Sequence, residues 1–438
     1  MNIGILKIIN EKLPDSIKIV LGPIIRFSLI KNPVFKRQID ELNKADMWDA
    51  KKVAISQLEH LKSILQFAYE NSKYYKEIFD LVDFNPYSLV DFNDIKKIPI
   101  LTREILEKRY DDLIVPNVTN YYQVTTGGTA GKPIKLLLEK DSIFKERAFV
   151  YHFWAKAGYD YKHSRLATFR GVKFNNEISK YNPLYNEMMF NPFILNDNNV
   201  KEYVKKIDSF GATFLYGYPS AISNFCRLLS KNNLTLNRKI EAVFLISENI
   251  YENQVKIIED TIKCKIYSFY GHTERAVFAE QKENGYSFNP VYGVVELSNE
   301  NNGKVICTGF LNRKMPLIRY ELDDYAHLIE GGIYNIHGHH DQDVLIGKND
   351  ERIAIAAINF HCDTLKNIAA YQFVQKEKGK LNFNVQADSK LSDAELNDIK
   401  EALTLKVGNT FDCKIMQVDE MELTKRGKFK MIIQELEI

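Results

Sequence analysis

Hydrophobic residues recur at helical spacing in several long stretches of the chain. Between residues 49 and 79 they follow a period of three to four residues until Asn71-Ser72-Lys73, which predicts a long amphipathic helix that closes there. The segment 101–110 predicts a short helical hairpin, and the same spacing predicts helices over 141–157 and 200–210. The first half of the chain is therefore expected to be rich in helix.

Short β-rich runs alternate with helical patterns after residue 160. They cover 166–169, 213–216, 242–246 and 265–270. Strand, helix and strand repeated in this order predict a parallel sheet with helices on its faces, which is the α/β class. Beyond residue 288 the runs are shorter and separated by Asn and Gly, at 294–297, 304–308 and 327–336. This second pattern predicts a small antiparallel subdomain.

The last hundred residues form a pattern of their own. Strands are predicted near 370–375, 381–387 and 413–418, around a helix over 392–407, which indicates a small α+β domain. A chain of 438 residues is also too long for one ordinary core. We therefore predict a helical lead over 1–100, a large α/β core over 101–340 and a small mobile C-terminal domain over 341–438.

Composition narrows the classes of partner. The chain has 59 basic and 57 acidic residues, so no global field would attract nucleic acid, and small molecules or proteins are the expected partners. The five cysteines are widely spaced and never form a C-x-x-C pair. This pattern favours a reducing cytoplasm and argues against both a disulfide framework and a structural zinc site.

The N-terminal segment 3–30 is rich in Ile and Leu. Six charged residues, together with Pro14 and Pro23, interrupt every window long enough to cross a bilayer, and no small-residue cleavage site follows. We expect no transmembrane segment and no signal peptide. An amphipathic helix packed on the protein is the favoured interpretation, with a peripheral membrane contact through 19–30 as the alternative.

A loop rich in hydroxyl groups and glycine carries the first chemical signal. Its sequence is Thr125-Thr126-Gly127-Gly128-Thr129-Ala130-Gly131-Lys132-Pro133. The glycines let successive N–H groups converge on an anion, and the threonines and the lysine add donors and a charge, which suits phosphate. A Walker A loop is excluded because Thr126 and Pro133 stand where that motif needs Gly and Ser or Thr. A plain glycine hairpin between two strands remains the alternative.

Three further segments combine chemically active residues. Phe269-Tyr270-Gly271-His272-Thr273-Glu274 ends a predicted strand, at the edge where ligands bind in open α/β sheets. Pro316-Leu317-Ile318-Arg319-Tyr320-Glu321-Leu322-Asp323-Asp324 ends an apolar run in two acids, and Leu423-Thr424-Lys425-Arg426-Gly427-Lys428-Phe429-Lys430 is a basic turn near the C-terminus. Taken singly, each also has a structural interpretation: a strand cap, a solvated acidic loop and a basic surface tail.

The order of these four motifs resembles the adenylate-forming superfamily of acyl-activating enzymes. Within it the chain is most similar to the phenylacetate:coenzyme A ligase group, and to its CapK-like branch in capsular polysaccharide biosynthesis. Gly217-Tyr218-Pro219-Ser220 and Ser247-Glu248 also match that branch. The resemblance covers nearly the whole chain. It implies that the core binds nucleotide and acyl group, while the C-terminal domain rotates after adenylation.

The resemblance also implies a role for each motif residue. The loop Thr125–Lys132 would enclose the β- and γ-phosphates of ATP, and Tyr270 would stack on the base. The residues implied on the adenine and ribose side are Ser247, Glu248 and Asn249, and those implied near the acyl and phosphate groups are Gly271 and His272. Of the remaining residues, Thr273 would contact the α-phosphate, Glu274 would hold Mg²⁺, Asp324 would accept from the ribose hydroxyls and Lys428 would be the catalytic lysine of adenylation.

Two positions depart from the superfamily pattern. Asp323 stands where glycine usually precedes the ribose contact, which is acceptable if its backbone φ is unexceptional. His339 stands where arginine usually contacts the nucleotide, and a neutral imidazole cannot repeat that bidentate contact. The histidines His337, His339 and His340 also suggest a metal cluster. Neighbours on a strand point to opposite faces and no thiol or carboxylate partner is evident, so this alternative is weaker.

The implied activity is ATP- and Mg²⁺-dependent adenylation of a small carboxylic acid, followed by transfer to an amine or thiol acceptor. An amide-forming ligase of surface-polysaccharide synthesis is the first hypothesis, because polar residues such as Arg170, Tyr218 and His152 hint at a hydrophilic substrate. A coenzyme A ligase for a small aromatic or aliphatic acid is the second. A non-catalytic nucleotide-binding descendant is the third. A homodimer is compatible with the resemblance.

Overall fold

The protein divides into two compact units. The computed structural model describes residues 22, 24, 26–125, 135–170, 177–337, 344–349, 352–354, 367–407, 410–423 and 429–436. Unit 1 comprises Met1–Ser164, Pro183–Asn186 and Tyr267–Gly338, and unit 2 comprises Arg165–Asn182, Glu187–Ile266 and His339–Ile438. The predicted domain limits at residues 100 and 340 remain a prediction. Within the described part of the chain, no helix is both long and apolar enough to cross a membrane.

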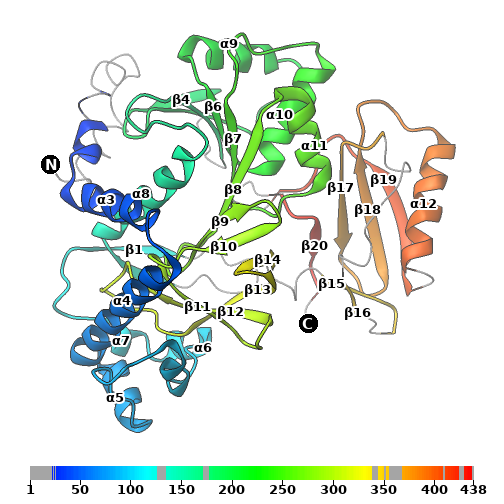
Figure 1. Ribbon diagram of the computed structural model, residues 1–438. Helices are drawn as coiled ribbons and strands as arrows, with labels where there is room; N and C mark the ends of the chain where they lie inside the picture. The colour runs from blue at the N-terminus through cyan, green and yellow to red at the C-terminus, as the bar shows by residue number, and fades with distance from the viewer. Residues whose placement is uncertain are drawn as a thin grey trace. The chain divides into compact units, whose positions relative to one another are not determined.

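The helices of unit 1 come first along the chain (Figure 1). They are α3 Pro33–Ala45, α4 Ala50–Asn71, α5 Lys73–Leu81, the 3-10 helix η1 Phe92–Lys97, α6 Arg103–Lys108, α7 Tyr110–Leu113 and α8 Asp141–Ala155. Asp49 caps α4 by accepting a hydrogen bond of 2.7 Å from the backbone N–H of Lys52. The helix ends at Asn71 as predicted, because Ser72 is extended (φ −112°, ψ 126°), and α5 then continues the run.

The strands of unit 1 form an antiparallel sheet and a separate hairpin. The hairpin is β1 Tyr121–Thr125 and β2 Lys135–Glu139. The sheet strands, in spatial order, are β11 Gly293–Leu297, β12 Asn302–Gly309, β13 Tyr320–Glu330, β14 Ile333–His337, β10 Gly285–Phe288, β9 Phe278–Lys282 and β8 Lys265–Gly271. The antiparallel subdomain is confirmed, but the single strand predicted over 327–336 is wrong. Gly331 and Gly332, with φ of 54° and 77°, turn the chain between β13 and β14.

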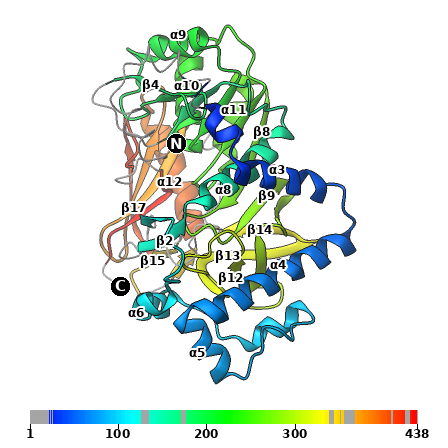
Figure 2. The same cartoon turned by 90° about the vertical axis from the view of Figure 1, so that its left-hand side faces the viewer.

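The main core of unit 1 lies between its helices and β11–β13. In Figure 2, α4 and α5 lie beside this part of the sheet. Leu61, Leu65 and Phe79 from the helices are fully buried with Val305 and Ile318 from the sheet side. The Tyr75 hydroxyl, also buried, donates to the carbonyl of Pro316 at 2.9 Å and accepts from Ile318 N–H at 3.0 Å. The helical lead is therefore anchored on the segment just before β13.

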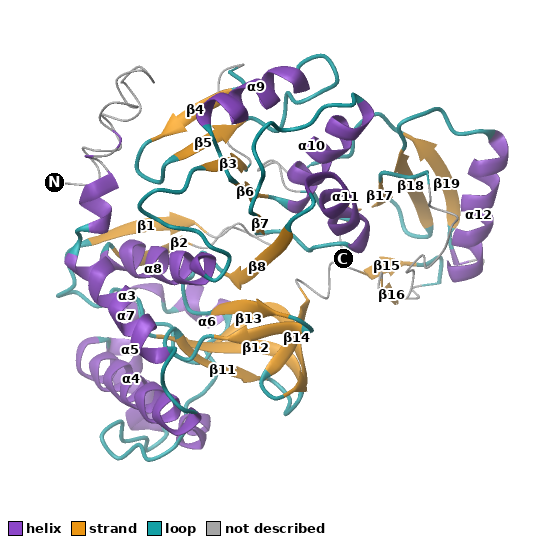
Figure 3. Ribbon diagram, turned by 45° about the horizontal axis from the view of Figure 1, so that its top comes forward, coloured by secondary structure: helices purple, strands orange, loops and turns teal. Residues whose placement is uncertain are grey.

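Unit 2 contains the predicted parallel sheet. Its strands are β3 Leu166–Phe169, β4 Ser179–Asn182, β5 Glu187–Phe190, β6 Phe214–Gly217 and β7 Ala242–Leu245, and its helices are α9 Val200–Phe210, α10 Pro219–Lys231 and α11 Glu252–Ile262. Strands β5, β3, β6 and β7 are parallel neighbours, and β4 adds an antiparallel edge. Figure 3 shows α10 and α11 side by side. The short, largely polar β4 gave no strand signal in the sequence.

The C-terminal part of unit 2 is an α+β module, as predicted. Its elements are β15 Val344–Ile346, β16 Arg352–Ala354, β17 Ala370–Gln375, β18 Lys380–Gln386, α12 Asp393–Val407, β19 Asp412–Gln417 and β20 Ile432–Gln434. The sheet order is β19-β18-β17-β20, with β17 and β18 antiparallel and the outer pairs parallel. Ile399 and Leu403 of α12 are buried with Phe373 and Phe383 of the sheet.

Close backbone contact at the end of β6 makes Gly217 essential to this sheet. A Cβ at Gly217 would lie 2.0 Å from the carbonyl oxygen of Phe169, in the paired strand β3. Because the obstructing atom is backbone, the strand itself would have to move. Strands β3, β6 and β7 end at one level, since Phe169 pairs with Gly217 and Gly217 with Leu245.

Gly217→Ala is expected to destabilise the protein strongly. Overpacking typically costs about 1–3 kcal/mol, and the obstruction by backbone at 2.0 Å places this substitution at the upper end of that range, so the urea midpoint and the melting temperature should both fall. Gly271→Ala is the matched control, because a Cβ there would meet no atom closer than 3.6 Å. Equal stability of the Gly217→Ala protein and the wild type in urea unfolding would contradict the close approach.

Candidate functional site

The glycine-rich segment joins the two strands of the β1–β2 hairpin. Thr125 at the end of β1 is exposed and pairs with Lys135 at the start of β2. The hairpin strands of the alternative interpretation are therefore present. The other predicted phosphate ligands lie outside the described residues: Thr126, Gly127, Gly128, Thr129, Gly131 and Lys132. Phosphate binding by this segment stays a prediction.

Three side chains of unit 1 meet at the carboxyl end of β8. The Tyr270 hydroxyl donates a hydrogen bond of 2.8 Å to Asp324 Oδ2, which comes from β13. His272 Nε2 lies 2.8 Å from the same oxygen. The two rings meet edge to face, with centroids 4.7 Å apart. Strand β8 and strand β13 thus bring together residues 54 positions apart in sequence.

The protonation of Tyr270 follows from this arrangement. Burial of the hydroxyl, and then the neighbouring Asp324 carboxylate, raises the pKa of Tyr270 well above its ordinary value. The tyrosine therefore remains a hydrogen-bond donor at physiological pH. Asp324 is itself buried, with 4% of its surface exposed, so its carboxylate depends on these polar neighbours.

The rest of the Tyr270–Glu274 motif follows β8 directly. Gly271 and Thr273 are exposed, whereas Glu274 is buried. His272 Nδ1 lies 3.9 Å from a Glu274 carboxylate oxygen. The next residue, Arg275, has a left-handed backbone (φ 52°) and donates from its guanidinium to Ser142 Oγ at 2.8 Å. This contact anchors the turn that holds the motif.

The unusual Asp323-Asp324 pair fits the strand without strain. In β13 the burial alternates, so Asp323 is exposed while Asp324 faces Tyr270 and His272. Asp323 lies in β13 opposite the register shift between Lys304 and Ile306 of β12, and its φ is not positive, so an aspartate can replace glycine there. The departure from the superfamily pattern at this position leaves the orientation of Asp324 intact.

The predicted residues of unit 2 gather at the carboxyl edge of its parallel sheet. Arg170 follows β3, Tyr218 follows β6, and Ser247 and Asn249 follow β7. Ser247 and Asn249 are exposed, and Arg170 and Tyr218 are half-buried. Ser247 adopts a left-handed backbone with φ of 66°, which is costly for a residue with a side chain. Ligands of open α/β sheets bind at such an edge.

Glu248 is already engaged in hydrogen bonds. Its carboxylate accepts from the backbone N–H of Ser220 at 3.1 Å and from Ser220 Oγ at 3.1 Å. It also accepts from the backbone N–H of Phe429 at 2.6 Å. Ser220 and Phe429 were not predicted as site residues. Ser220 could have been noticed from its place in the Gly217–Ser220 motif, whereas nothing in the sequence pairs Phe429 with Glu248.

Arg170 is held at the sheet edge by a buried acid. Its Nη2 lies 3.5 Å from Glu187 Oε1, and its guanidinium lies 5.0 Å from the centroid of the Tyr216 ring. Glu187 is 1% exposed and also accepts from Thr168 Oγ1 and Asn182 Nδ2, both at 2.8 Å. A half-buried cation at the carboxyl edge of β3 can bind an anionic or hydroxyl-rich ligand.

His152 lies in different surroundings. It belongs to α8, is 7% exposed, and its Nε2 lies 2.9 Å from Asp46 Oδ2 at the end of α3. Helices α3 and α8 pack against each other in unit 1. These contacts favour a structural role over the predicted contact with substrate.

Arg319 of the Pro316–Asp324 motif has a structural role that the sequence did not indicate. It is 8% exposed and has a left-handed backbone, with φ of 49°. Its guanidinium donates to both carboxylate oxygens of Glu296, at 2.9 and 3.0 Å, and to the carbonyls of Lys96 and Ile98. Arg319 therefore fastens the end of η1 to the sheet and sets the path of the chain into β13.

Two predicted residues, Lys428 and His339, lie outside the described residues. The proposed histidine cluster falls largely there as well. Among the residues that the structure describes, no group of three or more His, Cys, Asp or Glu side chains is arranged to hold a metal ion. A magnesium ion in a nucleotide site usually takes one or two carboxylates plus phosphate oxygens. The carboxylate of the buried Glu274 is an oxygen ligand of the kind that Mg²⁺ takes in such sites.

Comparison with known proteins identifies relatives of this chain by sequence. Residues 345–435 match the CapK C-terminal domain family. The chain is also 25% identical over 281 residues to Protein CapK of Staphylococcus aureus. That alignment covers 62% of this chain and 62% of the length of Protein CapK.

Solved structures with a similar fold include 2-hydroxyisobutyryl-CoA ligase in the postadenylation state with 2-HIB-AMP. The TM-score is 0.67 at 15% identity, over 88% of this chain and 90% of the ligase. The same ligase with R3-HIB-AMP gives a TM-score of 0.66, with the same identity and coverage. The same ligase in the thioesterification state, with 2-HIB-AMP and CoA, gives a TM-score of 0.51 at 16% identity, over 89% of this chain and 91% of the ligase. The comparisons thus confirm the resemblance to CapK proteins, and the chain has the α/β fold of the acyl-CoA ligases.

Proposed function

We propose that this protein adenylates a carboxylic acid with ATP and transfers the acyl group to an acceptor. The observation that carries the proposal is the cluster of Tyr270, His272 and Asp324. Glu274 lies two residues after His272, in the turn that follows β8. Together they provide an aromatic face, a carboxylate for hydroxyl groups and a second carboxylate for a hard cation within one small region of unit 1. An adenosine phosphate needs these three kinds of contact.

The chemistry explains why these groups are needed. A carboxylate oxygen of the acid attacks the α-phosphorus of ATP, the bond to the β-phosphate breaks, and pyrophosphate leaves with the electron pair. Asp324 would accept from the ribose hydroxyls, while Tyr270 would hold Asp324 in place and present its ring to the base. Glu274 would hold Mg²⁺, which, when bound, offsets negative charge on the phosphates.

The remaining residues are assigned by the same proposal. Thr273 and the segment Thr125–Lys132 would contact phosphates. Ser247 and Asn249 would lie toward the adenine and ribose, and Gly271 and His272 toward the acyl group. Arg170 and Tyr218, at the carboxyl edge of unit 2, would contact the acid. Lys428 would bridge the carboxylate and the α-phosphate, stabilising the charge that develops there.

We further propose that the acceptor is an amine and that the product is an amide in surface-polysaccharide synthesis. The amine nitrogen would attack the acyl carbonyl carbon, the bond from that carbon to the phosphate oxygen would break, and AMP and a proton would leave. Similarity to Protein CapK and the polar surroundings of Arg170 support this choice. Coenzyme A as a thiol acceptor is the alternative, because the ligase with a similar fold was solved with CoA.

Pyrophosphate exchange into ATP tests the adenylation step directly. Purified protein with Mg²⁺ is expected to catalyse exchange that depends on one class of acid in a panel of uronic acids, amino acids and aryl acids. ATP binding without exchange for any acid would contradict the proposal and favour a non-catalytic nucleotide-binding protein.

The acceptor is then decided with the acid that supports exchange. We expect amide formation with amino sugars, amino acids or ammonia, and no thioester when coenzyme A is the only acceptor. Thioester formation as the faster reaction would instead identify an acyl-CoA ligase.

A further inference from the structure

The carboxylate of Glu248 connects two distant parts of unit 2. On one side it accepts from the N–H and the hydroxyl of Ser220, in the first turn of α10. On the other it accepts from the N–H of Phe429, which is 181 positions away in sequence. One acidic side chain therefore holds the sheet edge, the start of a helix and the C-terminal module together.

The position of Glu248 at α10 has a physical reason. Tyr218 precedes this helix and offers no side-chain cap, so the first N–H groups need another acceptor. A carboxylate at a helix N-terminus satisfies a free N–H and interacts favourably with the helix dipole. The left-handed Ser247 turns the chain immediately before Glu248. The acid is thus held in place before it meets Phe429.

Phe429 comes directly after a run of basic residues near the C-terminus in the sequence. It forms a β-bridge with Leu423. Its ring also meets the ring of Tyr251 edge to face, with centroids 6.2 Å apart. Lys428 directly precedes Phe429 in the sequence. The N–H bound by Glu248 therefore belongs to the peptide bond that joins Lys428 to Phe429.

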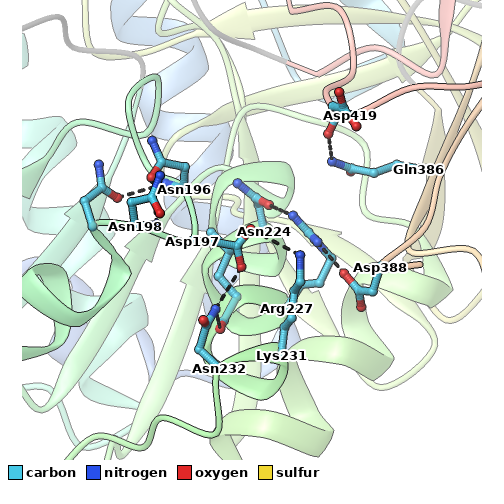
Figure 4. Close-up of polar contacts among 12 residues, drawn as sticks. Asn196, Asp197, Asn198, Asn224, Arg227, Lys231, Asn232, Gln386, Asp388 and Asp419 are labelled. Atoms are coloured by element: carbon cyan, nitrogen blue, oxygen red, sulfur yellow. Dashed lines mark hydrogen bonds and ion pairs between the residues drawn. The ribbon is translucent and has the colours of Figure 1, made fainter. Parts of the chain in front are cut away.

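Among the described residues, other contacts join the C-terminal module to α10 and α11. Arg227 of α10 forms an ion pair with Asp388, which follows β18 (Figure 4). Asn253 Nδ2 of α11 donates to the carbonyl of Ala369 at 3.3 Å. Asp388 is half exposed, so its ion pair is expected to contribute little to stability. These contacts hold the module at other residues, whereas Glu248 binds the backbone of Phe429.

We propose that Glu248 is a positioning residue that acts through the Phe429 peptide on Lys428, rather than a ligand of the nucleotide. The inference rests on the proposed adenylation and refines the role expected for Glu248 in that reaction. Glu248 would be needed while the lysine works in the first half-reaction. Transfer from a preformed acyl-adenylate does not need the lysine, so its rate would be independent of Glu248.

The test compares Glu248→Ala and Glu248→Gln with two matched controls. Asp388→Ala removes the ion pair between the module and Arg227, and Ser220→Ala removes only one donor to Glu248. Adenylation kcat is expected to fall about 10- to 100-fold in Glu248→Ala, the range for losing a hydrogen bond to a charged group, with KM for ATP within about threefold. Both controls should stay within about threefold of the wild type.

Transfer from synthetic acyl-adenylate to the acceptor supplies a second readout. Its rate is expected to be unchanged in Glu248→Ala. A KM for ATP raised tenfold or more with normal kcat would overturn the proposal, since that is the result of losing a nucleotide ligand. An equal loss in Asp388→Ala would also overturn it, because general docking of the module would then explain the effect.

Hydrogen exchange separates this inference from the proposed function. The peptide that contains the Phe429 amide is expected to exchange faster in Glu248→Ala, to exchange faster by a smaller factor in Glu248→Gln, whose amide oxygen is a weaker acceptor than a carboxylate, and to exchange at the wild-type rate in Asp388→Ala. Should the wild type fail to adenylate any acid, the proposed function fails, yet this measurement still tests the contact. Unchanged exchange at Phe429 would overturn the positioning role. If Glu248→Ala does not fold, Glu248→Gln, which keeps one acceptor oxygen, serves for each measurement.

Discussion

Glu274→Gln is expected to lower the rate of acyl-adenylate formation by about a thousandfold. The amide keeps the shape of the side chain but loses the charge that would hold Mg²⁺, and removal of one preorganised electrostatic group typically costs about 100- to 1,000-fold. The loss should be greater at low Mg²⁺, and the Mg²⁺ midpoint of ATP–pyrophosphate exchange should rise. Both quantities come from one titration of exchange rate against Mg²⁺ concentration.

The environment of Glu274 makes this test specific. The carboxylate is buried beside His272 in the turn after β8, so the isosteric change keeps the packing. Glu283→Gln is the control, since Glu283 is an exposed acid between β9 and β10 of the same unit. A Glu274→Gln protein with the wild-type rate and Mg²⁺ midpoint would show that Glu274 does not hold the metal.

Lys428→Ala is expected to reduce acyl-adenylate formation to near the limit of detection, a loss of about a thousandfold or more. The ammonium group would stabilise negative charge that accumulates at the α-phosphorus as the carboxylate attacks. Because that charge is absent in the ground state, KM for ATP should change little while kcat falls. Single-turnover formation of acyl-adenylate, followed by chromatography, measures this directly.

The control for Lys428 comes from the same basic stretch of sequence. Lys425→Ala removes an equal charge three residues earlier and should keep most of the activity. Melting temperatures should agree among the wild type and both variants. Normal adenylation by Lys428→Ala would refute the assignment of this lysine, and equal losses in the two variants would point to the net charge of this stretch of sequence instead.

Part of the candidate site could be predicted from the sequence, because it depends on residues that are close together along the chain. The turn after a β-rich run places Tyr270 to Glu274 at the carboxyl end of β8, as the sequence indicated. The side-chain alternation of β13 likewise places Asp324 inward and Asp323 outward. By contrast, the motif residue Arg319 proved to be buried and paired with Glu296, and His152 proved to lie between two helices. Residue type alone does not distinguish a binding cation from a structural one.

Hydrophobic periodicity by itself determined most helices and strands, the α/β class and the α+β character of the C-terminal region, because an element that buries one face needs an apolar pattern within a few residues. Only the tertiary structure decided which polar groups meet. The pairs Tyr270–Asp324 and Glu248–Phe429 join residues 54 and 181 positions apart. Such contacts depend on strand order and register, which are set by the packing of the whole unit, so no local pattern in the sequence contains them.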